Sequence, residues 1–391
     1  MKASTRTDPH ALHLVSALNA DTHALLASEG RSADQENRFP LRSIAKLREL
    51  GFFSYGVPSS FGGRGGTASG FKLLTVEIAK SCLSTSIIWA MHTQQLFSLV
   101  AASFPDKGRV LTRQLAEAPL LASVTTERTG SDLLKPTTQA ILSENKVLFE
   151  RAAPIVTCGN QADCFLTTVL LRDHDQDLPA LVLVERGDGQ ICSTGSWHAM
   201  GMRPTQSVPL RMHVRVPVER LVAAPMSSLM ANVFIPFGHL AYGAAWYGAA
   251  LGAYLSTLKI LREQAAQNSR QLDSELLRNR LAECRMRLYF MACMLQAITS
   301  DIDSIVQQSP VLQSTSFSIA INNLKLGCSR LSFEVVDLLV EILGVSKGYT
   351  VSERTSIERV FRDLRAASLM YHDDRLRAVN GQLIFLEALA D

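Results

Sequence analysis

The feature that most constrains this chain is its hydrophobic pattern, which changes from helical to β and back to helical. Up to about residue 119, apolar residues such as Leu41, Ile44 and Leu47 recur at helical spacing. Short runs rich in β-branched residues then alternate with turn signals, such as residues 187–189. Beyond about residue 225, the helical pattern returns in runs long enough for a bundle.

This pattern predicts an α+β protein with three domains. We expect an N-terminal helical domain over residues 1–119 and a middle antiparallel β-barrel domain over residues 120–225. A C-terminal four-helix bundle is expected over residues 226–391. Apolar residues make up 47% of the 391, enough to bury a sizeable core.

Charge, cysteine usage and the N-terminus exclude several functional classes. The net charge is only +3 and no long Lys/Arg block occurs, so neither nucleic acid nor a membrane is expected as a partner. The seven cysteines form no CxxC pair and no metal-binding spacing, which is typical of a reduced protein. The first nine residues are polar and lack a secretory signal, so we expect a cytoplasmic protein.

Four segments resemble, in order and spacing, motifs of the acyl-CoA dehydrogenase superfamily. They are residues 38–63, residues 124–132 (VTTERTGSD, for VTEPxAGSD), residues 155–163 (IVTCGNQAD, for WITN(G/A)) and residues 197–207 (WHAMGMRPTQS, for KMGxRx(S/T)). Each motif alone is weak, but the four together cover nearly the whole chain. The chain is therefore identified as a divergent member of this superfamily, which also contains flavin-dependent monooxygenases.

The resemblance implies a flavin, which needs polar donors at its edge and a flat slot that excludes water. Gly130 and Ser131 would approach a phosphate. The residues expected to line the ring are Val124, Thr125, Ile155, Val156 and Thr157. As isolated residues, the two threonines are ordinary strand residues.

In the family the cofactor is FAD, bound across the interface of a homodimer or homotetramer. A Gln-x-x-Gly-Gly turn of the partner subunit touches its adenine end. Here the matching stretch begins at Glu341 and keeps one glycine, Gly344. The family's Arg-x-x-Phe-Gly arm is also missing near residues 262–268. FAD remains the expected cofactor, with FMN as an alternative.

The catalytic carboxylate of the family is missing. The usual Glu follows an Arg-Asp pair, which is residues 362–363 here; ungapped counting places Tyr371 in its position, and alignment on the tyrosine places His372 there. Some members carry the base on the first bundle helix, but residues 236–242 contain no acid either.

Three interpretations follow from the missing Glu. The first is α,β-dehydrogenation of an acyl-CoA or acyl-carrier-protein thioester in specialised metabolism, with His372 or Asp373 as base and an electron-transfer flavoprotein as partner. The second is a two-component monooxygenase that takes reduced flavin from a reductase, with His92 facing the flavin. The third is a catalytically silent scaffold. The first is our main expectation, although residues 372–374 also fit an ordinary helix start.

Overall fold

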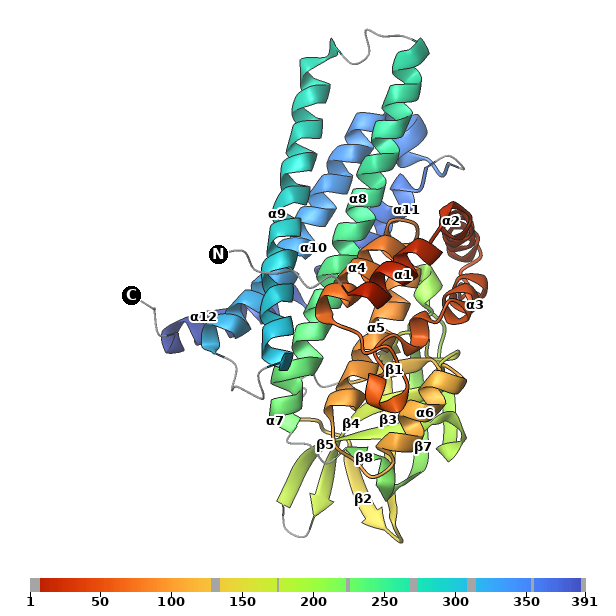
Figure 1. Ribbon diagram of the computed structural model, residues 1–391, viewed down its shortest axis with the longest axis vertical. Helices are drawn as coiled ribbons and strands as arrows, with labels where there is room; N and C mark the ends of the chain where they lie inside the picture. Colours follow the sequence, from red (N-terminus) through yellow and green to blue (C-terminus); the bar gives the residue numbers. More distant parts are fainter. Residues whose placement is uncertain are drawn as a thin grey trace.

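The computed structural model describes residues 8–127, 134–173, 176–222, 226–267, 273–307, 314–352 and 355–387. Helices come first along the chain, a sheet follows, and helices complete it (Figure 1). The predicted α+β fold class is therefore confirmed. In Figure 1 the sheet lies at one end of the molecule, the long C-terminal helices at the other, and the N-terminal helices beside both.

The described N-terminal residues fold mainly into α-helices. Their first helix begins where the Asp8 carboxylate accepts hydrogen bonds from the N–H groups of His10 and Ala11, with Pro9 at the first helical position. The helices are α1 (Pro9–Ala17), α2 (Ala20–Gln35), α3 (Leu41–Glu49), α4 (Ala68–Ala79), α5 (Leu83–Ala101) and α6 (Lys107–Ala116), with short 3-10 turns η1 (Phe52–Ser54) and η2 (Ser59–Phe61).

The middle part is one sheet with the order β6-β7-β3-β2-β4-β5-β8, and β1 pairs with β4 beside this path. Its strands are β1 (Leu121–Val124), β2 (Gln139–Ser143), β3 (Lys146–Val156), β4 (Cys164–Asp173), β5 (Gln176–Glu185), β6 (Gly189–Ser193), β7 (Val208–Pro217) and β8 (Leu221–Val222). Burial alternates along β7, as expected for a strand with one face on the core.

The sheet departs from the expected antiparallel arrangement in two pairings. Both β1 and β2 run parallel to β4, whereas the other pairs are antiparallel. Parallel strands need a long connection. Here β2 and β3 lie between β1 and β4 in the sequence, and β3 lies between β2 and β4. The local pattern of each strand carried no information about this pairing. The short turns η3 (Arg186–Asp188), η4 (Arg203–Thr205) and η5 (Val218–Arg220) connect the later strands.

The C-terminal part is a helical bundle built around α8. Its elements are α7 (Met226–Leu229), the π-helix η6 (Met230–Phe234), α8 (Ile235–Gln267), α9 (Glu275–Gln307), α10 (Thr315–Gly344), the π-helix η8 (Val345–Tyr349), α11 (Ile357–Leu364), α12 (Asp373–Leu383) and the 3-10 turn η9 (Ile384–Leu386). A Cβ on Gly248 or Gly252 would lie within 2.6 Å of a backbone oxygen of the segment 76–80, so α8 packs directly on the end of α4.

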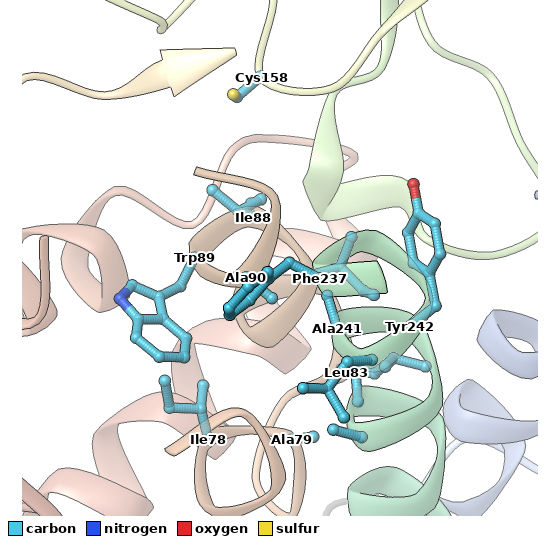
Figure 2. Close-up of a cluster of buried hydrophobic side chains, with 14 of the residues drawn as sticks. Ile78, Ala79, Leu83, Ile88, Trp89, Ala90, Cys158, Phe237, Ala241 and Tyr242 are labelled. Atoms are coloured by element: carbon cyan, nitrogen blue, oxygen red, sulfur yellow. The ribbon is translucent and has the colours of Figure 1, made fainter. Parts of the chain in front are cut away.

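The largest core cluster joins the three parts of the chain. Figure 2 shows Trp89 and Ala90 of α5 beside Phe237 and Ala241 of α8, with Cys158 of the β part above them. The small residues of α8 let neighbouring helices approach it closely. Within the described residues, no helix is long and apolar enough to cross a bilayer.

Candidate functional site

The residues expected to line a flavin ring lie at the ends of two strands that contact each other, β1 and β3. Val124 is fully buried, and its carbonyl accepts a hydrogen bond from Thr167 Oγ1 at 3.0 Å. Val156 is buried as well, whereas its neighbour Ile155 is 50% exposed. Burial alternates along β3, and Ile155 on its exposed side offers an apolar surface to a bound ring.

Hydroxyl groups gather beside this surface. Thr157 Oγ1 lies 3.1 Å from Ser207 Oγ, which lies 2.8 Å from Thr205 Oγ1. Thr125 Oγ1 lies 3.4 Å from Ser123 Oγ at the end of β1. Together with backbone N–H groups, these hydroxyls suit the polar edge of an isoalloxazine ring. We call Val124, Thr125, Ile155, Val156 and Thr157 the flavin wall.

The predicted phosphate contacts, Gly130 and Ser131, lie outside the described residues. The chain on both sides of them is joined by Glu127. One carboxylate oxygen accepts from the N–H and hydroxyl of Thr137, the other from the same groups of Thr138. The second oxygen also accepts from Arg151 at 3.0 Å, in a buried ion pair. Burial lowers the pKa of Arg151 to about 10, and Glu127 partly offsets this.

The segment 197–207 joins the flavin wall to the Arg362-Asp363 pair. The N–H of Met202 donates to the Asp363 carboxylate at 2.5 Å, and a Cβ on Gly201 would meet the Arg362 carbonyl at 2.2 Å. Only glycine permits this approach. Asp363 is buried, which raises its pKa to about 6, while Arg359 opposes the shift.

The three residues proposed at the base position point in different directions. Tyr371 is partly buried and contacts both core clusters of the protein. His372 has a side chain 57% exposed and accepts from the N–H of Asp374 at 3.4 Å, as an N-cap of α12. Asp373 is buried in the bundle. Of these three residues, only Tyr371 is partly buried against both core clusters.

Asp373 is engaged by residues of α10. One carboxylate oxygen accepts from Lys325 Nζ at 2.5 Å, and the other accepts from Ser329 Oγ at 2.8 Å. Lys325 is itself fully buried and also donates to the Ala367 carbonyl at 3.0 Å. Burial lowers the pKa of Lys325, and Asp373 opposes this shift. A carboxylate held in this way supports structure and is not free to take a substrate proton.

His92 occupies the interior of α5 with both ring nitrogens engaged. Nδ1 accepts from the N–H of Leu121 at 3.0 Å, and Nε2–H donates to the Phe53 carbonyl at 2.9 Å. Burial lowers its pKa to about 4, so the ring is neutral. His92 thus connects α5 to the start of β1 through backbone contacts, which leaves neither nitrogen for a ligand.

Sequence reasoning missed His239, in the first turns of α8. Its ring is 98% buried, lies edge-on to Tyr371 with centroids 5.4 Å apart, and makes no hydrogen bond through either nitrogen. Burial is the main cause that lowers its pKa to about 3, and the charge of Lys325 adds to it. The nearby Asn322 amide acts to raise the pKa, although it makes no hydrogen bond to the ring. Each unsatisfied buried nitrogen costs about 1–3 kcal/mol. The signal is present in the sequence, because residues 236–242 contain a histidine although they contain no acid.

The residues expected at the adenine end lie at the end of α10. The Glu341 carboxylate pairs with Arg280 of α9 at 2.9 Å, and Gly344 has φ +66°, a conformation that favours glycine. Glu341 is half exposed, so its charge faces solvent on the outer side of the bundle. Among the described residues, no group of three or more His, Cys, Asp or Glu side chains is arranged to hold a metal.

The order of the elements, helices followed by a sheet and then a helical bundle, is that of a class of flavoprotein oxidoreductases. Two family models match the chain: the N-terminal domain of acyl-CoA dehydrogenase at residues 20–108 and its C-terminal domain at residues 229–371. The chain belongs to the acyl-CoA dehydrogenase family. Since the family uses FAD and solved neighbours hold FMN, its cofactor is a flavin.

Curated relatives support this assignment at low identity. A short-chain-specific acyl-CoA dehydrogenase from Clostridium acetobutylicum is 22% identical over 86% of this chain and 87% of its own length. A cyclohex-1-ene-1-carbonyl-CoA dehydrogenase from Syntrophus aciditrophicus is 27% identical over 50% of this chain and 49% of its own.

Solved structures share the fold over nearly the whole chain. FMN-bound TdsC from Paenibacillus sp. A11-2 has a TM-score of 0.81 at 17% identity, covering 93% of this chain and 96% of its own. A structure described as an electron transferring flavoprotein of Acidaminococcus fermentans has a TM-score of 0.84 at 19% identity and covers both chains fully. KijD3 with FMN and a dTDP-amino sugar has a TM-score of 0.81 at 17% identity, covering 98% and 96%.

Proposed function

We propose that this flavoprotein is a two-component monooxygenase, which receives reduced flavin from a separate reductase and uses O2 to oxidise a small organic substrate. The observation that carries the proposal is the state of Asp373. Asp373 is the buried carboxylate nearest in sequence to the family's base position. Lys325 donates to one of its oxygens and Ser329 donates to the other. Dehydrogenation of a thioester in this family requires a carboxylate that is free to remove the α-proton.

The neighbouring carboxylate does not replace it. The side chain of Asp374 is 76% exposed and pairs with Arg377 at 2.7 Å. The remaining groups at the two base positions are the phenol of Tyr371 and the imidazoles of His372 and His239. Oxidation by O2 needs no proton to be taken from a carbon acid, so a site without a free carboxylate is compatible with it.

The solved neighbours support the same choice. TdsC is described as a dibenzothiophene monooxygenase, and another neighbour is a nitrososynthase from Micromonospora carbonacea. The flavin wall suits either flavin: the ring would lie against Ile155, with the hydroxyls of Thr125 and Thr157 at its edge. The cofactor supplies the redox chemistry. The chain's own residues bind the ring, orient the substrate and exclude water.

Dehydrogenation of an acyl-CoA or acyl-carrier-protein thioester is the second candidate. The curated relatives favour it, because their matches extend over most of the chain. It requires an imidazole in place of the carboxylate, either His372 or His239. An electron-transfer flavoprotein would then be the redox partner in place of a flavin reductase.

An anaerobic titration separates the two candidates. The flavin-loaded protein is mixed with a panel of acyl-CoA and acyl-carrier-protein thioesters, and the flavin absorbance is followed. We expect no bleaching. In a second step, a flavin reductase with NADH and O2 is supplied together with indole, which a solved neighbour binds. Oxygenated product in the second step supports the proposal, and bleaching in the first overturns it. Failure to retain any flavin would favour the silent scaffold.

A further inference from the structure

The histidine in the first turns of α8, His239, is a buried side chain without a hydrogen-bond partner. Both nitrogens of His239 lack hydrogen bonds, although the residue is 98% buried. Most buried polar side chains are hydrogen-bonded, and an exception of this kind calls for a physical reason. A histidine retained only for packing could be replaced by an apolar ring of similar size at lower cost.

Its neighbour Tyr371 is held in an unfavourable backbone conformation. The φ angle of Tyr371 is +51°, in the left-handed region that bulky side chains rarely adopt. The next residues are anchored, since Asp373 begins α12 and is bound by Lys325 and Ser329. Such strain is concentrated at functional sites and persists where neighbouring contacts impose it. Here it keeps the Tyr371 ring edge-on to the His239 ring, at an interplanar angle of 85°.

We propose that His239 binds the polar reacting end of the substrate by hydrogen bonds, with Tyr371 covering one side of it. This inference rests on the proposed function. A neutral imidazole offers one N–H donor and one acceptor nitrogen. The complementary ligand group must therefore accept and donate at the same point, as a phenol, another hydroxyl or an amide does.

The groups around His239 favour its neutral form. The charge of Lys325 on α10 acts on the His239 ring and disfavours its protonated form, and Lys325 is itself paired with Asp373 of α12. Asn322 of α10 and Tyr371 are uncharged. The imidazole is consequently a hydrogen-bonding group over the working pH range, so binding through it should not change between pH 6 and pH 8.

The test uses His239→Phe, which keeps a ring against Tyr371 and removes both nitrogens. Binding of phenol and of benzene to the flavin-loaded protein is measured by calorimetry. The parent should bind phenol about tenfold or more tightly than benzene. The His239→Phe variant should lose this preference while still binding flavin and benzene. His239→Gln, which restores a donor and an acceptor, should recover part of it. His213→Gln, an exposed histidine of β7, is the matched control and should behave as the parent.

Thermal unfolding gives a second readout that does not need the flavin. Because two unsatisfied groups disappear, we expect His239→Phe to raise Tm by about 2 °C or more, in the apoprotein as well. A fall in Tm would indicate a structural histidine and overturn the inference. An absence of phenol preference in the parent, or its persistence in His239→Phe, would also overturn it. Failure of the proposed function is separate, because it shows as bleaching by thioesters or as absence of flavin.

Discussion

At the scale of single residues, the ion pair with Lys325 occupies Asp373, the buried carboxylate that follows the family's base position in the sequence. A buried ion pair is costly to break, because the remaining charge is left in a low-dielectric interior without a partner. We expect Asp373→Asn to lower the free energy of unfolding by roughly 3 kcal/mol, measured by urea denaturation. Asp374→Asn, which removes an exposed carboxylate one position further on, should change it by less than about 0.5 kcal/mol.

The double variant Lys325→Met with Asp373→Asn provides the internal check. Since no charge is left unpaired, it should recover much of the stability lost in Asp373→Asn. If Asp373→Asn instead kept full stability and lost turnover, the carboxylate would be the base and the dehydrogenase interpretation would regain its support.

The same residues show which contacts could not be predicted from the sequence. The resemblance predicts a base position and the residues of the flavin wall, because motifs carry backbone spacing. It could not pair Asp373 with Lys325, since a lysine in a helical run is normally solvated and its burial depends on how α10 meets α12. His239 and His92 could not be distinguished either: both are buried histidines, and only their contacts separate a bonded ring from an unbonded one.

At the scale of elements, Glu127 fastens β1 to the start of β2 across the residues that carry the phosphate motif. Glu127→Gln leaves Arg151 buried without a counter-ion and removes acceptor strength toward the N–H groups of Thr137 and Thr138. We expect the free energy of unfolding to fall by about 3 kcal/mol and flavin binding to weaken about tenfold.

The measurements are urea denaturation and quenching of flavin fluorescence. Glu150→Gln is the matched control, because this exposed carboxylate of the neighbouring strand β3 contacts only His213 in an ion pair. It should leave both quantities unchanged. Flavin affinity that is unaffected in Glu127→Gln would show that the strand connection does not support the cofactor site. The sequence indicated only that a glutamate replaces the family's proline here, and the parallel β1–β4 pairing that positions it was not predictable from local pattern.

At the scale of the whole molecule, buried titratable groups set how stability depends on pH. Burial lowers the pKa of His92 to about 4 and that of His239 to about 3, from the ordinary histidine value of 6.5. Below pH 6.5 the unfolded chain therefore binds more protons, so the stability present above pH 6.5 is lost as pH falls. Asp363 acts in the opposite direction, because burial raises its pKa to about 6 and the folded protein takes up its proton.

Two histidines outweigh one carboxyl group between pH 7 and pH 5. The free energy of unfolding should decrease by roughly 2 kcal/mol over this range, as measured by urea denaturation at both values. In His239→Phe, one of the two contributions is absent, so the decrease should be close to zero. An equal decrease in this variant and the parent would mean that His239 is protonated in the folded protein.

Exposed apolar side chains lead us to expect that the chain associates with copies of itself. They lie on α9 and on η9, which follows α12 where it extends to the side of the molecule (Figure 1), and include Leu276, Met286, Tyr289, Phe290, Ile384, Phe385 and Leu386. Phe385 is 89% exposed, an unfavourable arrangement for a monomer in water. Closed symmetric assemblies are the usual solution, so we expect a homodimer or homotetramer.

Phe385→Asp should weaken this association at least tenfold, because it places a charge in an interface that is otherwise apolar. Sedimentation velocity at micromolar concentration checks this against Ile141→Asp, which alters an apolar residue of the sheet that is 62% exposed. If the expected flavin site spans subunits, as in the family, dissociation should also release the cofactor in proportion to the monomer formed. Monomeric parent protein that retains flavin would contradict both expectations and place the whole cofactor site within one chain.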